Sequence, residues 1–459
     1  MKKLFFFFVL LITTKLVLAQ YSTDSATSKI DTEKTVAWIK QNASPLKSVK
    51  AGNGFEDLDH LKAVLENVQI VGLGEATHGT KEFFQMKHRM IEFLVKEMGF
   101  TVIALEFNSN GANNINKYIL SGKGDIYYAL ASQGLLVWNT EEIINMIEWL
   151  RDYNQTVPDD RKVRFMGFDF RVNWVGDNFD VIKEYLKRVD LKSANQNDSL
   201  LNLVKKIDSG SIKGINTDSC KNEFLKFFAN FSINKGDYVQ HTSKNEYENI
   251  FQRLAYITQN LCWNHISGYN ARELYTEKVK LRDYYMSSNF MSFFQNEKPN
   301  TKFIVWAHNG HISKAGPSSE NGNIKYFGNY LNEAYGKKYY AFGFSFDKGS
   351  FQSYGYSDER KPLGMMEFTV SAEHKKTLDW YLSQTGLNPF IINFRTNQIP
   401  DFMNEFLSAK LLARSPGAEV VQGLEERLNS FVEINKCYDA LIFINNTSGA
   451  TPFVYKQKP

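Results

Sequence analysis

Two short apolar runs on either side of a helical pattern constrain the fold of this chain more than any other feature. Residues 70–73 and 101–107 are apolar runs of strand length. Between them, residues 81–98 carry apolar side chains with helical spacing, and Thr80 is placed to cap this helix at its N-terminus. Strand, helix and strand in this order predict a βαβ unit, whose right-handed crossover makes the two strands parallel.

Side chains with acid–base chemistry follow both strands. Glu75 and His78 come directly after the first strand, and Glu106 lies at the end of the second. Because open α/β sheets bind ligands at the carboxyl ends of their strands, we expect these side chains to converge there. Gly74 and Gly79 flank the first pair and allow the backbone bends and the close substrate approach that such a loop needs.

The pattern of an apolar strand followed by a polar group repeats along the chain. Residues 163–169 end in Asp169, and residues 303–311 end in His308 and His311. The sequence therefore predicts an α/β fold with a largely parallel central sheet flanked by helices. Further strands are expected at residues 339–346, 390–394 and 440–444.

A different pattern occupies residues 178–298, where apolar side chains recur every three or four residues. We expect this part to form a helical insertion within one catalytic domain that spans residues 20–459. Polar connectors are expected at residues 193–199 and 232–243. The predicted helices cover residues 181–189, 200–207, 223–231, 249–261 and 274–294.

Composition narrows the class of protein. The 459 residues are 43% hydrophobic, which is sufficient for one large core or two smaller ones. A net charge of +4 without a basic stripe gives no support to nucleic-acid binding. The three cysteines, Cys220, Cys262 and Cys437, are too few and too scattered for a disulfide framework, so we expect buried free thiols.

Residues 1–19 have the features of a secretory signal peptide. Lys2 and Lys3 precede an apolar run, and a small-residue cleavage site lies before Gln20. Lys15 interrupts the apolar run, which argues against a spanning helix. We therefore expect a periplasmic or secreted protein with no stable membrane insertion after the signal is removed, and an uncleaved anchor is the alternative.

Five groups at strand ends form the predicted catalytic cluster. A single histidine or glutamate at a strand end is more often structural, but five together favour chemistry. Histidine titrates near neutrality and serves as a general base, and a neighbouring carboxylate raises its basicity and fixes its tautomer. The chain has no serine-esterase elbow, zincin motif or nucleotide-binding loop, which leaves water activated by histidine or by a metal. The five groups are Glu75, His78, Glu106, His308 and His311.

Four separated motifs resemble those of the erythromycin esterase family, in the expected order between Val71 and Ile444. The resemblance implies an α/β core with a helical portion around a deep cleft. It also implies a cofactor-free hydrolase that opens macrolide lactones without a serine nucleophile. The motifs are Gly74-Glu-Ala-Thr-His-Gly79, Ala104-Leu-Glu106, Arg282-Asp-x-x-Met286 and Trp306-Ala-His-Asn-Gly-His311.

The resemblance assigns roles to single residues. His78 matches the general base that activates water, and the other four groups of the cluster match the polar residues around it. Lys87 stands where macrolide-hydrolysing members can carry arginine, a change that keeps the charge but loses the bidentate fork. The segment from Trp138 to Glu142 also looks like family sequence, with Trp138 or the glutamates lining the cleft. Substrate contacts are therefore expected at Lys87, Trp138, Asp169 and Arg282.

The leading mechanism and its alternatives use the same cluster. His78, oriented by Glu75 or Glu106, takes a proton from the water that attacks the ester of a macrolide. His308 or His311 then polarises the oxyanion or protonates the leaving alkoxide. In the first alternative the cluster holds Zn²⁺ or Mn²⁺ in a metal-dependent hydrolase or peptidase. In the second, the chain is a non-catalytic exported ligand-binding protein, against which the intact cluster argues.

Overall fold

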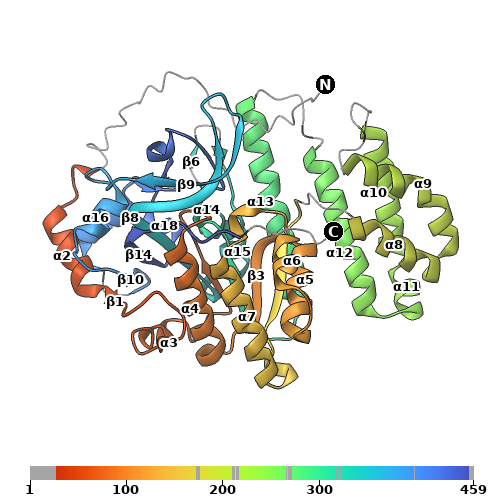
Figure 1. Ribbon diagram of the computed structural model, residues 1–459, viewed down its shortest axis with the longest axis horizontal. Coiled ribbons are helices and arrows are strands. Elements are labelled where there is room, and N and C mark those ends of the chain that lie inside the picture. Colours follow the sequence, from red (N-terminus) through yellow and green to blue (C-terminus); the bar gives the residue numbers. More distant parts are fainter. Residues whose placement is uncertain are drawn as a thin grey trace. The chain divides into compact units, whose positions relative to one another are not determined.

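The chain folds into two compact units in the computed structural model, coloured along the sequence in Figure 1. Of the described residues, Asp169–Tyr285 form the smaller unit and the remainder form the larger one. The predicted signal, residues 1–19, lies outside the described residues. The structure describes residues 27–453 except 172–175, 209–211, 213–216, 265, 267–270, 317, 320–321 and 397–398.

A ten-stranded sheet forms the centre of the larger unit in the described part of the chain. Its strands are β1 (Ser44–Pro45), β2 (Ile70–Leu73), β3 (Val102–Asn108), β4 (Arg164–Asp169), β5 (Phe303–Trp306), β8 (Tyr339–Tyr356), β9 (Pro362–Val370), β10 (Phe390–Asn393), β12 (Glu419–Val421) and β14 (Ala440–Thr447). The order is β1-β10-β14-β8-β2-β5-β3-β4, with β9 and β12 also paired to β8. The central strands β14, β8, β2, β5 and β3 are parallel, which confirms the predicted fold class.

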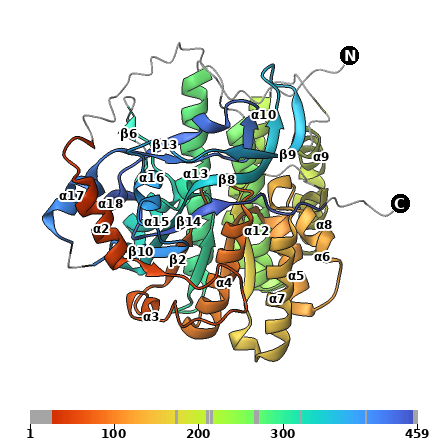
Figure 2. The ribbon, with the colours of Figure 1, turned by 60° about the vertical axis from the view of Figure 1, so that its left-hand side comes forward.

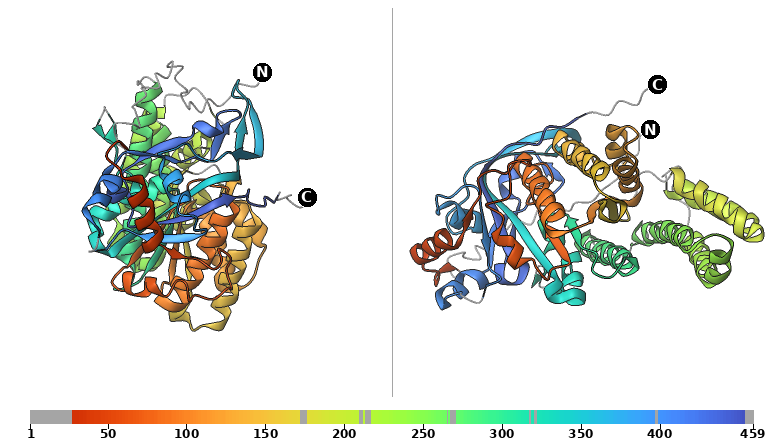
Figure 3. Two further views of the ribbon diagram at one scale, coloured as in Figure 1. Left: turned by 90° about the vertical axis from the view of Figure 1, so that its left-hand side faces the viewer. Right: turned by 90° about the horizontal axis from the view of Figure 1, so that it is seen from below.

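Some strands depart from the sequence prediction. β8 continues to Tyr356, ten residues beyond its predicted end at residue 346, and its second half pairs with β9 as an antiparallel ribbon (Figure 3). β10 pairs antiparallel with β14. The direction of β10 depends on its pairing with β14, which lies far away in the sequence. The extension of β8 was not predicted because the polar and glycine residues 347–350 interrupt its apolar run, although its partner β9 follows as early as Pro362.

The order of the central strands brings three strand ends together. β5 lies between β2 and β3, because Val305 pairs with Gly72 on one side and with Ala104 on the other. The carboxyl ends of these three parallel strands therefore lie at one edge of the sheet, as predicted for the residues that follow them.

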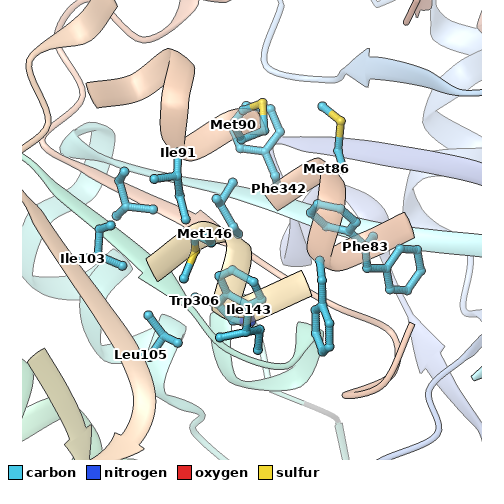
Figure 4. Packing of buried hydrophobic residues seen from close by; sticks show 14 of the residues in the cluster. Phe83, Met86, Met90, Ile91, Ile103, Leu105, Ile143, Met146, Trp306 and Phe342 are labelled. Carbon is cyan, nitrogen blue, oxygen red and sulfur yellow. The ribbon is translucent and has the colours of Figure 1, made fainter. Parts of the chain in front are cut away.

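Helices cover both faces of the sheet. Ile103 and Leu105 pack towards α4 and α7 in one core (Figure 4), and the alternate residues Val102 and Ala104 belong to a second core on the opposite face. On the first face, α4, α5 and α7 lie side by side (Figures 1 and 2). The helices of the first face are α3 (His60–Val64), α4 (Lys81–Met98), α5 (Ser109–Ser121), α6 (Ile126–Ala131) and α7 (Glu141–Thr156). The helices of the second face include α2 (Thr32–Asn42), α15 (Phe327–Tyr335), α16 (Leu378–Ser383), α17 (Asp401–Ser408) and α18 (Ile434–Cys437).

Helix α4 has the bounds that the sequence predicts, residues 81–98. It ends at Gly99, whose φ of 72° is accessible to glycine at little cost. Thr80 is the N-cap residue of α4, as predicted, but its hydroxyl lies 2.6 Å from the Thr77 hydroxyl and makes no capping hydrogen bond to the helix.

The smaller unit is helical and has its own apolar core, which includes Phe224 and Phe231. Its helices are α8 (Gly176–Val189), α9 (Leu191–Asp208), α10 (Thr217–Ile233), α11 (Lys235–His241), α12 (Lys244–Asn264) and most of α13 (Ala271–Asn296). The connector predicted at residues 193–199 lies inside α9, and α11 occupies most of the one predicted at 232–243. Cys220, Cys262 and Cys437 are free thiols. None of the described helices combines the length and the apolar character needed to cross a membrane.

We expect Gly79→Ala to destabilise the larger unit. A Cβ at Gly79 would lie 2.0 Å from the carbonyl oxygen of Gln352, a backbone atom that moves only with its strand. The expected loss is about 1–3 kcal/mol in urea unfolding. As a control, Gly236→Ala in α11 has open space and should stabilise by about 0.5–1 kcal/mol. Equal unfolding midpoints for Gly79→Ala and the wild type would contradict the close contact.

Candidate active site

The five residues of the predicted cluster lie together at the ends of β2, β3 and β5. The backbone N–H of His308 donates to Glu106 Oε2 (3.1 Å), and His311 Nε2 lies 3.3 Å from Glu106 Oε1. The rings of His78 and His308 have centroids 5.1 Å apart. The three strand ends therefore form one polar cluster around the short helix α14 (Asn309–Ile312).

Two close backbone contacts shape the loop that carries Glu75 and His78. Asn309 donates its backbone N–H to the Glu75 carbonyl (2.9 Å), and its side chain lies so close that a Cβ on Gly74 would fall 2.2 Å from Oδ1. Gly79 lies equally close to Gln352. Both glycines therefore make room for the protein's own atoms, a different reason from the substrate approach that we expected.

Glu75 is fully buried and accepts four hydrogen bonds. Oε1 accepts from His78 Nδ1 (2.6 Å) and from Trp138 Nε1 (3.3 Å). Oε2 accepts from Lys87 Nζ (2.6 Å) and from Trp306 Nε1 (2.8 Å). A carboxylate with this many donors is held in one orientation and stays ionised.

Burial and ion pairing shift the pKa values of Glu75 and Lys87. Burial alone raises the pKa of Glu75, but Lys87 and His78 more than offset it, and the pKa falls from 4.5 to about 2. Burial lowers the pKa of Lys87 to about 8, although Glu75 opposes the shift. Glu75 is therefore ionised at neutral pH. Its contribution to stability is present above pH 4.5 and is lost as the pH falls towards 2.

His78 has one nitrogen in use and one available. Because Glu75 is ionised, Nδ1 carries the proton that Oε1 accepts, which leaves the lone pair on Nε2. Nε2 makes no hydrogen bond to any described residue, and His78 keeps 7% of its surface exposed. Trp138 packs edge-on against the ring at a centroid distance of 5.1 Å. The neutral ring of His78 therefore presents its lone pair at Nε2, which is the tautomer that a general base requires.

His308 differs from His78 because both of its ring nitrogens are in use. Nδ1 accepts the Gly310 backbone N–H (3.2 Å), so the proton lies on Nε2, which donates to the Ala76 carbonyl (3.1 Å). Burial, with smaller effects of the charges on His78 and His311, lowers the pKa of His308 to about 4. The neutral imidazole of His308, with a hydrogen bond at each nitrogen, holds the loop after Glu75 in place.

Of the four residues predicted to contact substrate, two are buried and bind Glu75. Lys87 has no exposed surface and Trp138 has almost none, and both donate to Glu75. We therefore revise their predicted role from substrate contact to support of Glu75. Asp169 and Arg282 lie in the smaller unit, where Arg282 Nη2 contacts Asp169 Oδ2 at 2.7 Å. Their predicted substrate contact stays a prediction.

Sequence reasoning missed two supporting residues. Trp306 donates to Glu75 and lies under Lys87, whose Nζ is 4.3 Å from the centre of its ring. Asn309 joins the Glu75 loop to β8 through both backbone groups of Phe344. Both residues stand inside the motif Trp306-Ala-His-Asn-Gly-His311, so their position beside the histidines was the available signal.

The cluster is a poor fit to a metal ion. Among the described residues, no three side chains of His, Cys, Asp or Glu are grouped as ligands. Both oxygens of Glu75 already accept two hydrogen bonds each, and both nitrogens of His308 are bonded. Metal coordination by these groups would require the loss of those bonds.

We expect Lys87→Met to be among the most destabilising single changes. It leaves the Glu75 carboxylate buried without its cation, which costs about 3–5 kcal/mol in urea unfolding. Adding Glu75→Gln to this variant should recover part of the loss, because the unpaired charge is gone. As a control, Lys325→Met breaks an exposed pair with Glu333 and should cost less than about 1 kcal/mol. Equal costs at Lys87 and Lys325 would refute the buried pair.

Known proteins share this fold. A crystal structure of a Bacillus cereus protein matches with a TM-score of 0.80 at 24% identity and covers 92% of this chain and 100% of that chain. A mutant of the erythromycin esterase EreC in its open conformation matches with a TM-score of 0.67 at 18% identity and covers 88% of this chain and 96% of that chain.

Sequence comparison extends this likeness to the family. Erythromycin esterase type II of Escherichia coli is 24% identical over 417 residues, which are 87% of this chain and 97% of that protein. The family model described as erythromycin esterase matches residues 95–447, a segment that contains Glu106, His308 and His311. The resemblance to the family is confirmed, and the chain belongs to the erythromycin esterase family.

Proposed function

We propose that the protein is a hydrolase that opens the lactone ester of macrolides with water activated by His78. The observation that carries the proposal is the state of His78: Nδ1–H is held by the ionised Glu75, Nε2 makes no hydrogen bond to a described residue, and His78, unlike Glu75, keeps some exposed surface. Family membership supports an ester as the substrate, and the Escherichia coli relative is named an erythromycin esterase.

The mechanism follows from this pair. Nε2 of His78 takes a proton from water as the water oxygen attacks the ester carbonyl. Glu75 stabilises the resulting imidazolium, which then donates that proton to the leaving alkoxide as the C–O bond breaks. The products are a carboxylic acid and an alcohol, so a lactone becomes an open hydroxy acid.

The remaining residues divide between support and charge stabilisation. Lys87, Trp138 and Trp306 keep Glu75 ionised and fixed through their donors. His311, whose Nε2 lies 3.3 Å from Glu106 Oε1, is the second histidine that we assign to the developing oxyanion; in that role its ring is an imidazolium, with Nε2–H towards Glu106 and Nδ1–H towards the oxyanion. His308 has no nitrogen to spare for that role, so we assign it to positioning.

The central test is a matched pair of histidine variants. His78→Gln should lower kcat by about 10²–10⁴-fold on a macrolide lactone, because the base is lost, and urea unfolding checks that the variant is folded under the assay conditions. The control is His241→Gln, an exposed histidine of α11, which should keep wild-type turnover. Mass spectrometry follows the product, which is heavier than the substrate by one water. Undiminished turnover by His78→Gln would place the base elsewhere.

The same assay separates histidine from metal activation. With His78 as the base, turnover should survive exhaustive chelation. In the alternative, a metal-dependent hydrolase or peptidase, chelation should silence the enzyme and one divalent ion should restore it. A protein that binds macrolides without converting them would instead support the non-catalytic alternative.

We also propose that the protein is exported to the periplasm or beyond. The support is the charged start, apolar run and small-residue cleavage site of residues 1–19. The mature protein from an exporting host should begin at Gln20, as measured by intact mass. Recovery of the whole chain inside the cell would argue against export.

A further inference from the structure

The chain after β14 forms a short strap, residues 448–453, drawn in the deepest blue in Figure 2. Antiparallel bridges join Gly449 of the strap to Thr80, and Pro452 to Thr140. Thr80 lies two residues after His78, and Thr140 lies two residues after Trp138. The strap therefore connects the two loops whose side chains share Glu75 Oε1.

The first half of the strap holds the loop of His78. The Ala450 N–H donates to the Gly79 carbonyl, and the Lys81 N–H donates to the Ser448 carbonyl, both at 2.9 Å. Ser448 also donates its backbone N–H (2.8 Å) and its hydroxyl (2.5 Å) to the two carboxylate oxygens of Glu82.

The second half repeats this arrangement on the loop of Trp138. The Phe453 N–H donates to the Asn139 carbonyl (3.0 Å), and the Glu141 N–H donates to the Thr451 carbonyl (2.9 Å). Thr451 gives its backbone N–H and its hydroxyl to Glu142, both at 3.0 Å. The Glu142 carboxylate is therefore bound to the strap, which revises our expectation that a glutamate of this segment lines a cleft.

The two attachments use the same chemistry. Glu82 and Glu142 are the second residues of α4 and α7, where the helix dipole favours a negative charge. Each takes a backbone N–H and a hydroxyl from the strap, and the two hydroxyl residues are three positions apart. Ser448 and Thr451 thus bind the first turns of two helices, and the loops before these helices carry His78 and Trp138.

We propose that this strap is a positioning element of the active site, and that Ser448 and Thr451 are its positioning residues. His78 Nδ1 and Trp138 Nε1 both donate to Glu75 Oε1, so the orientation of His78 depends on how far apart their loops lie. The strap fixes that separation and keeps His78 Nε2 aimed at the reacting water. The kinetic part of this proposal rests on the proposed function, whereas the geometric part does not.

The test combines Ser448→Ala and Thr451→Val, singly and together. These variants lose the hydroxyl bonds to Glu82 and Glu142 but keep the backbone pairing. The double variant should lower kcat about 10-fold or more while KM stays within about threefold, because orientation rather than binding is lost. Thr451→Ser, which keeps a hydroxyl, should restore most of kcat in the single-site background.

A matched control removes the same chemistry elsewhere in the larger unit. Ser371 donates its backbone N–H (2.7 Å) and its hydroxyl (2.8 Å) to Oε1 of Glu426, whereas each strap residue divides the same two donors between both oxygens of its glutamate. Ser371→Ala should leave kcat and KM unchanged. Urea unfolding of all variants separates loss of stability from loss of orientation.

A second readout needs no turnover. The proton between His78 Nδ1 and Glu75 Oε1 sits in a short charge-assisted bond (2.6 Å) and should resonate far downfield in the proton NMR spectrum. Its loss in His78→Gln assigns it. In the double strap variant the resonance should shift or broaden, and in Ser371→Ala it should match the wild type.

These readouts separate the two proposals. If the wild type hydrolyses no macrolide, the proposed function fails, and a shifted resonance in the strap variants still supports the positioning role. An unchanged resonance in the folded double variant overturns that role, even if kcat falls. A kcat loss no larger than that of Ser371→Ala, in an active wild type, overturns it as well.

Discussion

The polar cluster at the ends of β2, β3 and β5 depends on how the buried negative charge of Glu75 is neutralised and hydrogen-bonded. A carboxylate without exposed surface is tolerated only when its charge and its lone pairs are matched. The donors come from the loop after β2, from α4, from the loop before α7 and from the end of β5. Satisfying this one charge therefore fixes four separate segments of the chain, and the position of His78 is a consequence.

The histidines of the cluster show how a second partner decides what an imidazole does. His78 faces a carboxylate, which places its proton on Nδ1 and leaves Nε2 for chemistry. His308 faces a backbone N–H and a backbone carbonyl, which places its proton on Nε2 and uses both nitrogens. The sequence gives no basis for distinguishing the two histidines, since both follow a strand of the same sheet. Their different chemistry comes from the partners.

Features encoded in neighbouring residues could be predicted from the sequence, whereas contacts between distant residues could not. Helix α4 was predictable from the helical spacing of its apolar residues, and the parallel strands were predictable from their short apolar runs. The meeting of Glu75, Glu106 and His308 followed from the shared direction of those strands. The partners of Glu75 were not predictable, because Lys87, Trp138 and Trp306 are separated from it by 12, 63 and 231 residues. The far half of β8 was missed for a local reason: residues 347–350 are polar or glycine and interrupt the apolar run, although the partner strand β9 begins as early as Pro362.

The same constraint explains why a lysine suits position 87. An ammonium is a point charge, and Lys87 Nζ contacts only Oε2 of Glu75 while it lies over the Trp306 ring. A guanidinium would present a planar fork that matches both carboxylate oxygens at once. In this site Oε1 already accepts from His78 and Trp138, so a bidentate partner would compete with the hydrogen bond that orients the base. Lysine neutralises the buried charge and leaves Oε1 to His78.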